Sequence, residues 1–166
     1  DNENYELLMN RSKNYRNLFD ESTQFLRARW EDGSWVTPYD PGIPYYVYMY
    51  RESNGWMSTF FAPQDPNGLV SLFPSKDAFE AKLDKLFSTP FGGYEADNMT
   101  GWFGQYCVGN QPSQGISYYY YFVGKPEKAQ EKIDIIMNDY YAMGKESLAY
   151  AGMDDEGSLS AWYVMN

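Results

Sequence analysis

Histidine is absent from the 166 residues of this chain, and cysteine occurs once, as Cys107. Without histidine the chain cannot perform Ser-His-Asp or Cys-His nucleophilic catalysis, and it cannot build histidine-ligated zinc or iron sites. A single cysteine cannot form a disulfide within the chain. Because aromatic residues precede Cys107, we expect a small buried side chain there rather than a reactive thiol.

Basic residues are also scarce: 13 lysines and arginines stand against 23 aspartates and glutamates, which gives a net charge of −10. Non-specific nucleic-acid affinity depends on clustered lysine and arginine, so this balance argues against a nucleic-acid partner. No run approaches the roughly 18 apolar residues that a membrane-spanning helix needs, and we expect no membrane span. The length allows one domain with a substantial core.

Two segments, 4–19 and 75–87, carry apolar residues at helical spacing. In the first, Tyr5 and Leu8 begin an apolar face that charged residues flank, which predicts an amphipathic helix. In the second, Ser75 is a good N-cap residue, and the apolar positions after it fall on one face.

A third helix is predicted over 127–143, because Pro126 suits a first helical position and Gly144 suits the residue after a helix end. The last stretch, 157–166, is predicted to form about two helical turns. Its apolar run stops at Asn166 without a cap or a polar tail. We therefore expect a fragment of a longer polypeptide, cut inside an element.

The remaining segments have weaker patterns. Turn formers interleaved with aromatic residues fill 20–44, which predicts a long irregular loop of the kind that carries function. The segments 45–62 and 101–108 are apolar and aromatic without a clean period, and we interpret each as a buried helix. Together these segments predict a mainly helical fold.

With histidine absent and cysteine solitary, acid–base chemistry must use carboxylates. These gather among aromatic and turn residues in 50–56, which contains Glu52, and in 152–157, which contains Asp154 and Asp155. Paired carboxylates with aromatic walls suit glycoside hydrolysis. Alternatively, Glu52 is an acid on a helix surface and the two aspartates cap the last helix. The second cluster could equally bind Ca²⁺, although it does not match an EF-hand loop.

Specific strings in this chain resemble glycoside hydrolase family 92 in their order and cover essentially its whole length. They are Asn14–Asp20, Asp32–Val36 with Pro38–Pro41, Glu52 with Asn54 and Trp56, Pro63–Asp65 with Gly68 and Leu69, Gly109–Ser113, and Asp154–Asp155 with Gly157 and Ser160–Val164. The resemblance implies a calcium-dependent, exo-acting α-mannosidase of bacterial type that inverts the anomeric configuration. It also implies secretion or a periplasmic location.

In fold, the resemblance implies that residues 1–166 are one segment of an (α/α)6 toroid of helical hairpins, about half of it. The chain would then lack upstream helices, an N-terminal β-sandwich and the C-terminal continuation of the toroid. Its partners would be α-mannoside glycans and the remainder of its own polypeptide.

The site residues that the resemblance implies fall into three groups. Glu52 corresponds to the general acid and Asp155 to the general base, with Asp154 as a supporting or calcium-linked carboxylate. Asn110 and Gln111 correspond to a calcium-associated Asn-Glu pair. The third group, which forms the sugar pocket, consists of Trp56, Asp65 and Trp162.

The chain departs from the family pattern around this site. Gln111 stands in place of glutamate, Gln114 and Gly115 in place of two histidines, Gln64 in place of another, and Met153 in place of asparagine or aspartate. An amide is a weaker Ca²⁺ ligand than a carboxylate. The sequence therefore leaves three readings open: an active α-mannosidase, a catalytically impaired glycan-binding relative, and a helical structural segment without a ligand.

Overall fold

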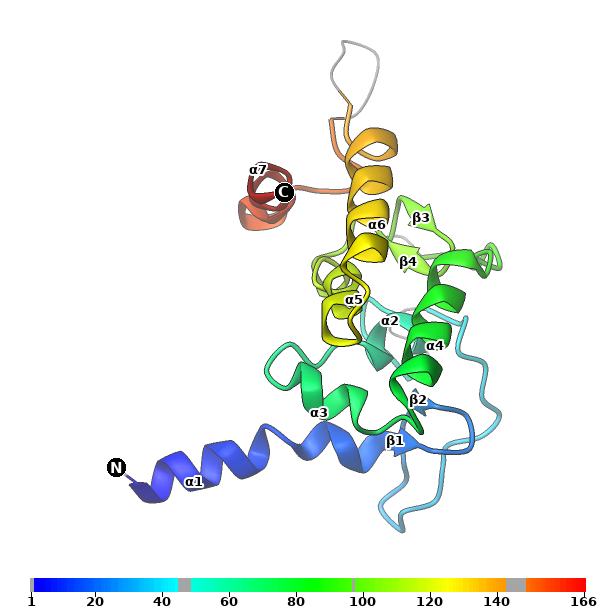
Figure 1. The fold of residues 1–166 in the computed structure, drawn as a ribbon. Coiled ribbons are helices and arrows are strands. Elements are labelled where there is room, and N and C mark those ends of the chain that lie inside the picture. The colour runs from blue at the N-terminus through cyan, green and yellow to red at the C-terminus, as the bar shows by residue number, and fades with distance from the viewer. Residues whose placement is uncertain (1, 45–48, 97, 143–148) are drawn as a thin grey trace.

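The computed structural model describes residues 2–44, 49–96, 98–142 and 149–166. Most of its elements are helices, joined by two two-stranded hairpins (Figure 1), which confirms the predicted class. In chain order the elements are α1 (Asn2–Arg11), η1 (Asn14–Leu18), β1 (Phe19–Asp20), β2 (Phe25–Leu26), α2 (Gly55–Thr59), α3 (Pro66–Val70), α4 (Lys76–Ser88), β3 (Trp102–Phe103), β4 (Tyr106–Cys107), η2 (Gln111–Ser113), η3 (Ile116–Tyr118), α5 (Tyr119–Phe122), α6 (Pro126–Asp139), η4 (Asp155–Gly157) and α7 (Ser158–Met165). Within the described ranges, every helix falls short of the length and apolarity needed to cross a membrane.

Helix α4 forms the centre of the core, as its pattern predicts. The Ser75 hydroxyl oxygen accepts the amide of Ala78 at 3.0 Å and satisfies one of the free donors at the helix start. Phe79, Leu83 and Leu86 on its inner face are completely buried. Burial of such side chains stabilises the fold by about 1.5–3 kcal/mol each.

Helix α6 begins at Pro126, as predicted, and lies against α4 through charged groups. The Lys128 ammonium pairs with Glu80 at 2.6 Å and with Asp84 at 2.7 Å, both on α4. The Tyr120 hydroxyl of α5 also donates to Asp84, at 2.8 Å. These contacts hold α4, α5 and α6 together as one layer.

The predicted end of α6 is wrong by several residues. The helix ends at Asp139, and Tyr140 leaves it with its hydroxyl donating to the Trp102 carbonyl at 2.9 Å. The tertiary contact thus replaces further helical turns. Gly144, the expected residue after the helix, lies outside the described residues.

The single helix predicted over 4–19 is also wrong, because α1 ends at Arg11 and a separate 3₁₀ helix follows. Just after the helix end the Ser12 hydroxyl donates to the Met9 carbonyl at 2.8 Å, and the Lys13 amide donates to the Asn10 carbonyl at 3.2 Å, which is the shorter spacing of a 3₁₀ turn. Every residue of α1 that the sequence placed on its apolar face, including Tyr5 and Leu8, is exposed. Figure 1 shows α1 extending away from the rest of the chain.

The buried helix predicted over 45–62 is reduced to the five-residue α2 in the described part of that segment. Asn54 caps it: its side-chain oxygen accepts the amide of Met57 at 3.0 Å. The residues just before Asn54 form bends rather than helix. Residues 45–48 lie outside the described residues.

The helix predicted over 101–108 is wrong, because β3 and β4 pair there as an antiparallel hairpin. The turn contains Gly104 at φ +64°, a conformation that favours glycine. A Cβ at this position would also lie 2.4 Å from the Phe87 carbonyl oxygen. Cys107 in β4 is buried, as expected, and burial raises the pKa of its thiol to about 12.

The irregular character predicted for 20–44 is largely confirmed. Its regular parts are β2, which pairs with β1, and an isolated bridge between Arg29 and Trp35. Beside it, Arg27 and Asp20 form a buried ion pair at 3.0 Å. The final helix predicted over 157–166 is also confirmed, as α7.

Candidate functional site

A pocket of about 670 Å³ lies where four segments of the chain meet. Its lining residues are Glu52, Asn98, Thr100, Gly109, Asn110, Ala151, Gly152, Met153 and Asp155. We call it the acidic pocket. The two residues that the sequence singled out as acid and base, Glu52 and Asp155, thus line one cavity although about a hundred residues separate them.

Glu52 lies in a bend before α2 and not on a helix surface, so the surface-helix alternative for this residue is wrong. Its φ of +48° is in the left-handed region, which costs a non-glycine residue on the order of 1 kcal/mol. Asn54 anchors this bend from the other side, where its amide donates to the Gln105 side chain at 2.9 Å. Strained backbone of this kind concentrates at functional sites.

Two consecutive amide side chains connect the segments that carry the carboxylates. Asn110, only 3% exposed, donates through Nδ2 to the backbone carbonyl of Glu52. The next residue, Gln111, donates through Nε2 to Oδ2 of Asp155. The 110–111 dipeptide therefore holds both acidic segments of the pocket.

A close backbone contact closes the pocket on another side. A Cβ on Gly152 would lie 2.5 Å from the carbonyl oxygen of Gly109, and a Cβ on Gly109 would lie 2.8 Å from that of Ala151. The Thr100 hydroxyl also donates to the Ala151 carbonyl. Only glycine at both positions lets these two backbones approach so closely.

The neighbouring aspartates 154 and 155 have different surroundings. Asp154 does not line the acidic pocket; its two carboxylate oxygens accept the amide of Ser160 at 2.8 Å and the Ser160 hydroxyl at 2.5 Å. These bonds lower the pKa of Asp154 below its usual value. Asp154 thus satisfies donors in the first turn of α7, while Asp155 faces the cavity.

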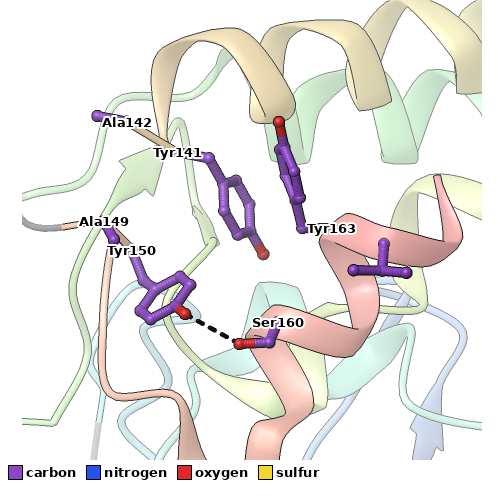
Figure 2. A pocket seen from close by; sticks show the side chains of 7 residues that line it. Tyr141, Ala142, Ala149, Tyr150, Ser160 and Tyr163 are labelled. Atoms are coloured by element: carbon purple, nitrogen blue, oxygen red, sulfur yellow. Dashed lines mark hydrogen bonds between the residues drawn. The ribbon is translucent and has the colours of Figure 1, made fainter. Parts of the chain in front are cut away.

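Ser160 links Asp154 to a second pocket of about 310 Å³ (Figure 2). Its lining residues are Tyr141, Ala142, Ala149, Tyr150, Ser160, Tyr163 and Val164. The Tyr150 hydroxyl and the Ser160 hydroxyl lie 2.9 Å apart, and the rings of Tyr141 and Tyr163 are 5.0 Å apart between centroids. We call it the tyrosine pocket. Ser160 belongs to its lining and also binds the Asp154 carboxylate, so this residue links the two.

Trp56, expected in the sugar pocket, is not among the residues that line the acidic pocket. Its ring meets Phe25 edge-on at 4.9 Å, and the Lys82 ammonium lies 5.0 Å from its centroid. Lys82 is itself buried, and its ammonium donates to the Thr23 carbonyl at 3.1 Å. Trp56 therefore packs under the first hairpin.

Asp65, another expected sugar contact, caps α3 and joins it to η1. Its carboxylate accepts the amide of Gly68 at 3.0 Å, the Tyr15 hydroxyl at 2.9 Å and the Arg16 guanidinium at 3.2 Å. Partial burial alone would raise the pKa of Asp65, but these hydrogen bonds outweigh it and lower the pKa. Gln64 beside it donates to the Ser12 carbonyl at 3.0 Å.

Trp162, the third expected sugar contact, is a buried residue of α7. Its indole donates to the Gln114 carbonyl at 3.1 Å, and its ring stacks on Tyr141 with centroids 5.8 Å apart. The Gln114 side chain in turn donates to the Ser158 hydroxyl at 3.3 Å. These contacts dock α7 on the preceding segment, and they leave the indole away from the acidic pocket.

Sequence reasoning missed Asn98 and Thr100 as pocket residues because it predicted a helix after them. A helix over 101–108 would separate Thr100 from Gly109 by about 13 Å. The observed hairpin instead pairs its two ends, and the Gly109 amide donates to the Thr100 carbonyl at 3.0 Å. The usable signal was Gly104 in the middle of a short aromatic run.

The oxygen atoms available to a metal ion are limited in the part of the chain that the structure describes. Within it, no three His, Cys, Asp or Glu side chains come together as a metal-binding group. Of the predicted calcium ligands, Asn110 lines the acidic pocket, Gln111 contacts its Asp155, and Asp154 is engaged by Ser160.

Known proteins resemble the chain along its whole length. A structure of a family GH92 alpha-mannosidase from Bacteroides thetaiotaomicron in complex with mannoimidazole is 30% identical, with a TM-score of 0.90 over 99% of this chain and 22% of that one. A family GH92 inverting mannosidase from the same organism is 30% identical, with a TM-score of 0.71 over 92% of this chain and 21% of that one.

A curated relative is also much longer than this chain. An uncharacterized secreted glycosidase of Arthroderma benhamiae is 24% identical over 186 residues, which cover 96% of this chain and 21% of that protein. The chain thus spans about a fifth of the length of these relatives. The profile of the glycosyl hydrolase family 92 catalytic domain matches residues 1–166. On this match, the chain belongs to glycosyl hydrolase family 92.

Proposed function

We propose that this chain is part of an exo-acting α-mannosidase that removes terminal mannose from α-mannosides of N-glycans or mannans by an inverting, calcium-dependent reaction. The observation that carries the proposal is the acidic pocket, where Glu52 and Asp155 face one cavity in a chain of this family. The matched mannosidases support mannose as the sugar.

Glu52 acts as general acid and Asp155 as general base. In an inverting reaction, the acid protonates the departing glycosidic oxygen while the base takes a proton from water on the opposite face of the sugar. Gln111 holds the Asp155 carboxylate through its amide, and Asn110 holds the Glu52 backbone. Asp154 supports the base indirectly, because its bonds to Ser160 fix the turn that carries Asp155.

Calcium belongs to the same proposal, with Asn110 and Gln111 as the residues that would hold it. Their amide oxygens are hard ligands of the type that Ca²⁺ takes, but two fall short of the six to eight it needs. Asp154, whose oxygens both accept from Ser160, does not fit as a ligand in this arrangement. When bound, the ion would supply positive charge to orient sugar hydroxyls.

We also propose that residues 1–166 form a segment of a longer, secreted or periplasmic bacterial enzyme with an (α/α)6 toroid and an N-terminal β-sandwich. The greater length of the relatives supports this, as does the name of the secreted one. Exposed apolar side chains at both ends, among them Tyr5, Leu8, Val164 and Met165, would be covered by the remainder of the polypeptide.

One observation favours a second function, a catalytically impaired relative that binds glycans. Met153, 75% exposed, lines the acidic pocket where a side chain that hydrogen-bonds sugar would be expected. A pocket that keeps its carboxylates but loses polar contacts could retain a sugar without turning it over.

The experiment measures calcium-dependent release of mannose from α-mannosides by the complete polypeptide that contains this segment. Replacing Glu52 with Gln should lower kcat about 10²–10⁴-fold, since the acid is lost while the shape is kept. Glu127→Gln, at an exposed position in the first turn of α6, is the matched control and should leave kcat unchanged. Undiminished turnover in Glu52→Gln would refute the acid assignment.

The same assay separates the alternatives. Saturable mannoside binding without turnover by the wild type would favour the impaired relative, and neither binding nor turnover would favour a purely structural segment. A comparison of Asp155→Asn with Asp154→Asn tests whether the two neighbouring acids have different roles. The first should lower kcat with little change in stability, whereas the second should lower stability more because Ser160 loses one of its two charged acceptor oxygens.

A further inference from the structure

The lining of the acidic pocket contains two chemically different sets of residues. One set has polar side chains and consists of Glu52, Asn98, Thr100, Asn110 and Asp155. The other is the run 151–153, in which alanine, glycine and methionine offer no strong side-chain donor or acceptor. We call the run 151–153 the apolar wall of the pocket, and a sugar that enters meets its Met153 side chain as well as the polar side chains.

The position of the apolar wall is fixed by its backbone. Gly152 packs directly on Gly109, and the Ala151 carbonyl accepts the Thr100 hydroxyl, so one backbone acceptor is already used. Met153 follows at once, lines the cavity and is 75% exposed. An occupant of the pocket can therefore contact the apolar side chain of Met153.

A sugar hydroxyl placed against the Met153 side chain would lose water partners without gaining a strong hydrogen bond from that side chain. Such a loss is costly, whereas a thioether makes favourable, adaptable contacts with methyl and methylene groups. At this wall the binding free energy is therefore less favourable for a free hydroxyl and more favourable for an apolar group.

We propose that Met153 is a specificity-determining residue that selects glycosides in which one sugar hydroxyl is replaced by hydrogen or carries a methyl group. The proposal rests on the proposed function of the acidic pocket and names its substrate class more narrowly: deoxy or O-methylated α-mannosides. A hydrophobic contact of this size discriminates by about tenfold or more.

The experiment uses the complete polypeptide and 4-nitrophenyl α-mannoside together with its monodeoxy and mono-O-methyl derivatives. We expect at least one derivative to exceed the parent mannoside about tenfold in kcat/KM. Met153→Asn should reverse this ratio, and Met153→Leu should keep it. Glu127→Gln, at an exposed position outside the pocket, should leave the ratio as in the wild type.

Binding of the same probes to the Glu52→Gln variant, measured by calorimetry, separates this proposal from the proposed hydrolysis. If nothing is hydrolysed but the derivative still binds more tightly than the parent, the hydrolysis proposal fails and the selectivity stands. Preference for the parent at every position, or an unchanged ratio in Met153→Asn, overturns the role of Met153. Absence of both binding and turnover overturns both proposals.

Discussion

The layer of α4 and α6 and the acidic pocket are held together by different forces. In the layer, buried side chains such as Leu83 and the ion pairs of Lys128 stabilise regular helices. In the pocket, side-chain amides bind backbone and carboxylate, the backbones of Gly109 and Gly152 approach closely, and Glu52 has a positive φ, as does Glu156 in the turn beside the pocket. The contacts of the layer therefore stabilise the folded chain, whereas the strained backbone at the pocket lowers the free energy of unfolding.

The largest expected effect on the free energy of unfolding comes from a buried residue of α4, in the layer. Leu83→Ala removes a completely buried side chain and should lower the free energy of unfolding by about 2–5 kcal/mol. Lys85→Ala, at an exposed position of the same helix, should change it by no more than about 0.5 kcal/mol. Denaturant titration of both variants checks this, and equal losses would contradict the central place of α4.

The next effect tests the close contact in the pocket. Gly152→Ala places a Cβ 2.5 Å from the Gly109 carbonyl oxygen and should cost about 1–3 kcal/mol. Gly115→Ala is the matched control, because no atom lies within 4 Å of its Cβ position and its φ of −85° suits alanine. That control should be neutral or slightly stabilising. Equal stability of the two variants in thermal unfolding would argue that the pocket loops separate readily.

A pH-dependent effect on the free energy of unfolding belongs to Lys82 in the layer. Burial, with a lesser contribution from Lys85, lowers the pKa of Lys82 from 10.5 to about 7. Between these values the unfolded chain binds the proton and the folded chain does not, so the free energy of unfolding should rise with pH from about 7 to about 10.5. Lys82→Met should lack this rise; parallel curves for the two proteins would contradict the lowered pKa.

The smallest effect compares one substitution in both regions. Glu156→Gly in the turn beside the pocket relieves a φ of +56° and should stabilise by about 0.5–1 kcal/mol. Glu131→Gly at an exposed position inside α6 should instead destabilise by about 1 kcal/mol. Chemical denaturation distinguishes the two signs, and a loss at Glu156 would mean that its side chain contributes more than its backbone costs.

The layer was largely predictable from sequence because its signals are local. Ser75, Pro126 and the apolar spacing after each of them define α4 and the start of α6 without reference to the rest of the chain. The predictions of secondary structure failed where the structure depends on contacts between residues far apart in the sequence. The 101–108 hairpin depends on the packing of Gly104 against Phe87, which no local window contains.

The candidate site was predicted in part, through the family resemblance. That resemblance singled out Glu52, Asp155 and Asn110, and the structure places all three around one cavity. It also grouped Asp65 and Trp162 with them, which the structure uses for capping and core packing. Motif order along a chain does not specify which side of a turn a side chain faces, so these roles could not be separated before the fold was known.

The amide pair 110–111 has a consequence for the order of folding. The bond from Asn110 to Glu52 spans 58 residues, and that from Gln111 to Asp155 spans 44. Closing such loops costs chain entropy that is repaid only after the intervening helices have packed. We therefore expect the acidic pocket to assemble last and to open first in native-state hydrogen exchange, so that a formed pocket reports a completely folded chain.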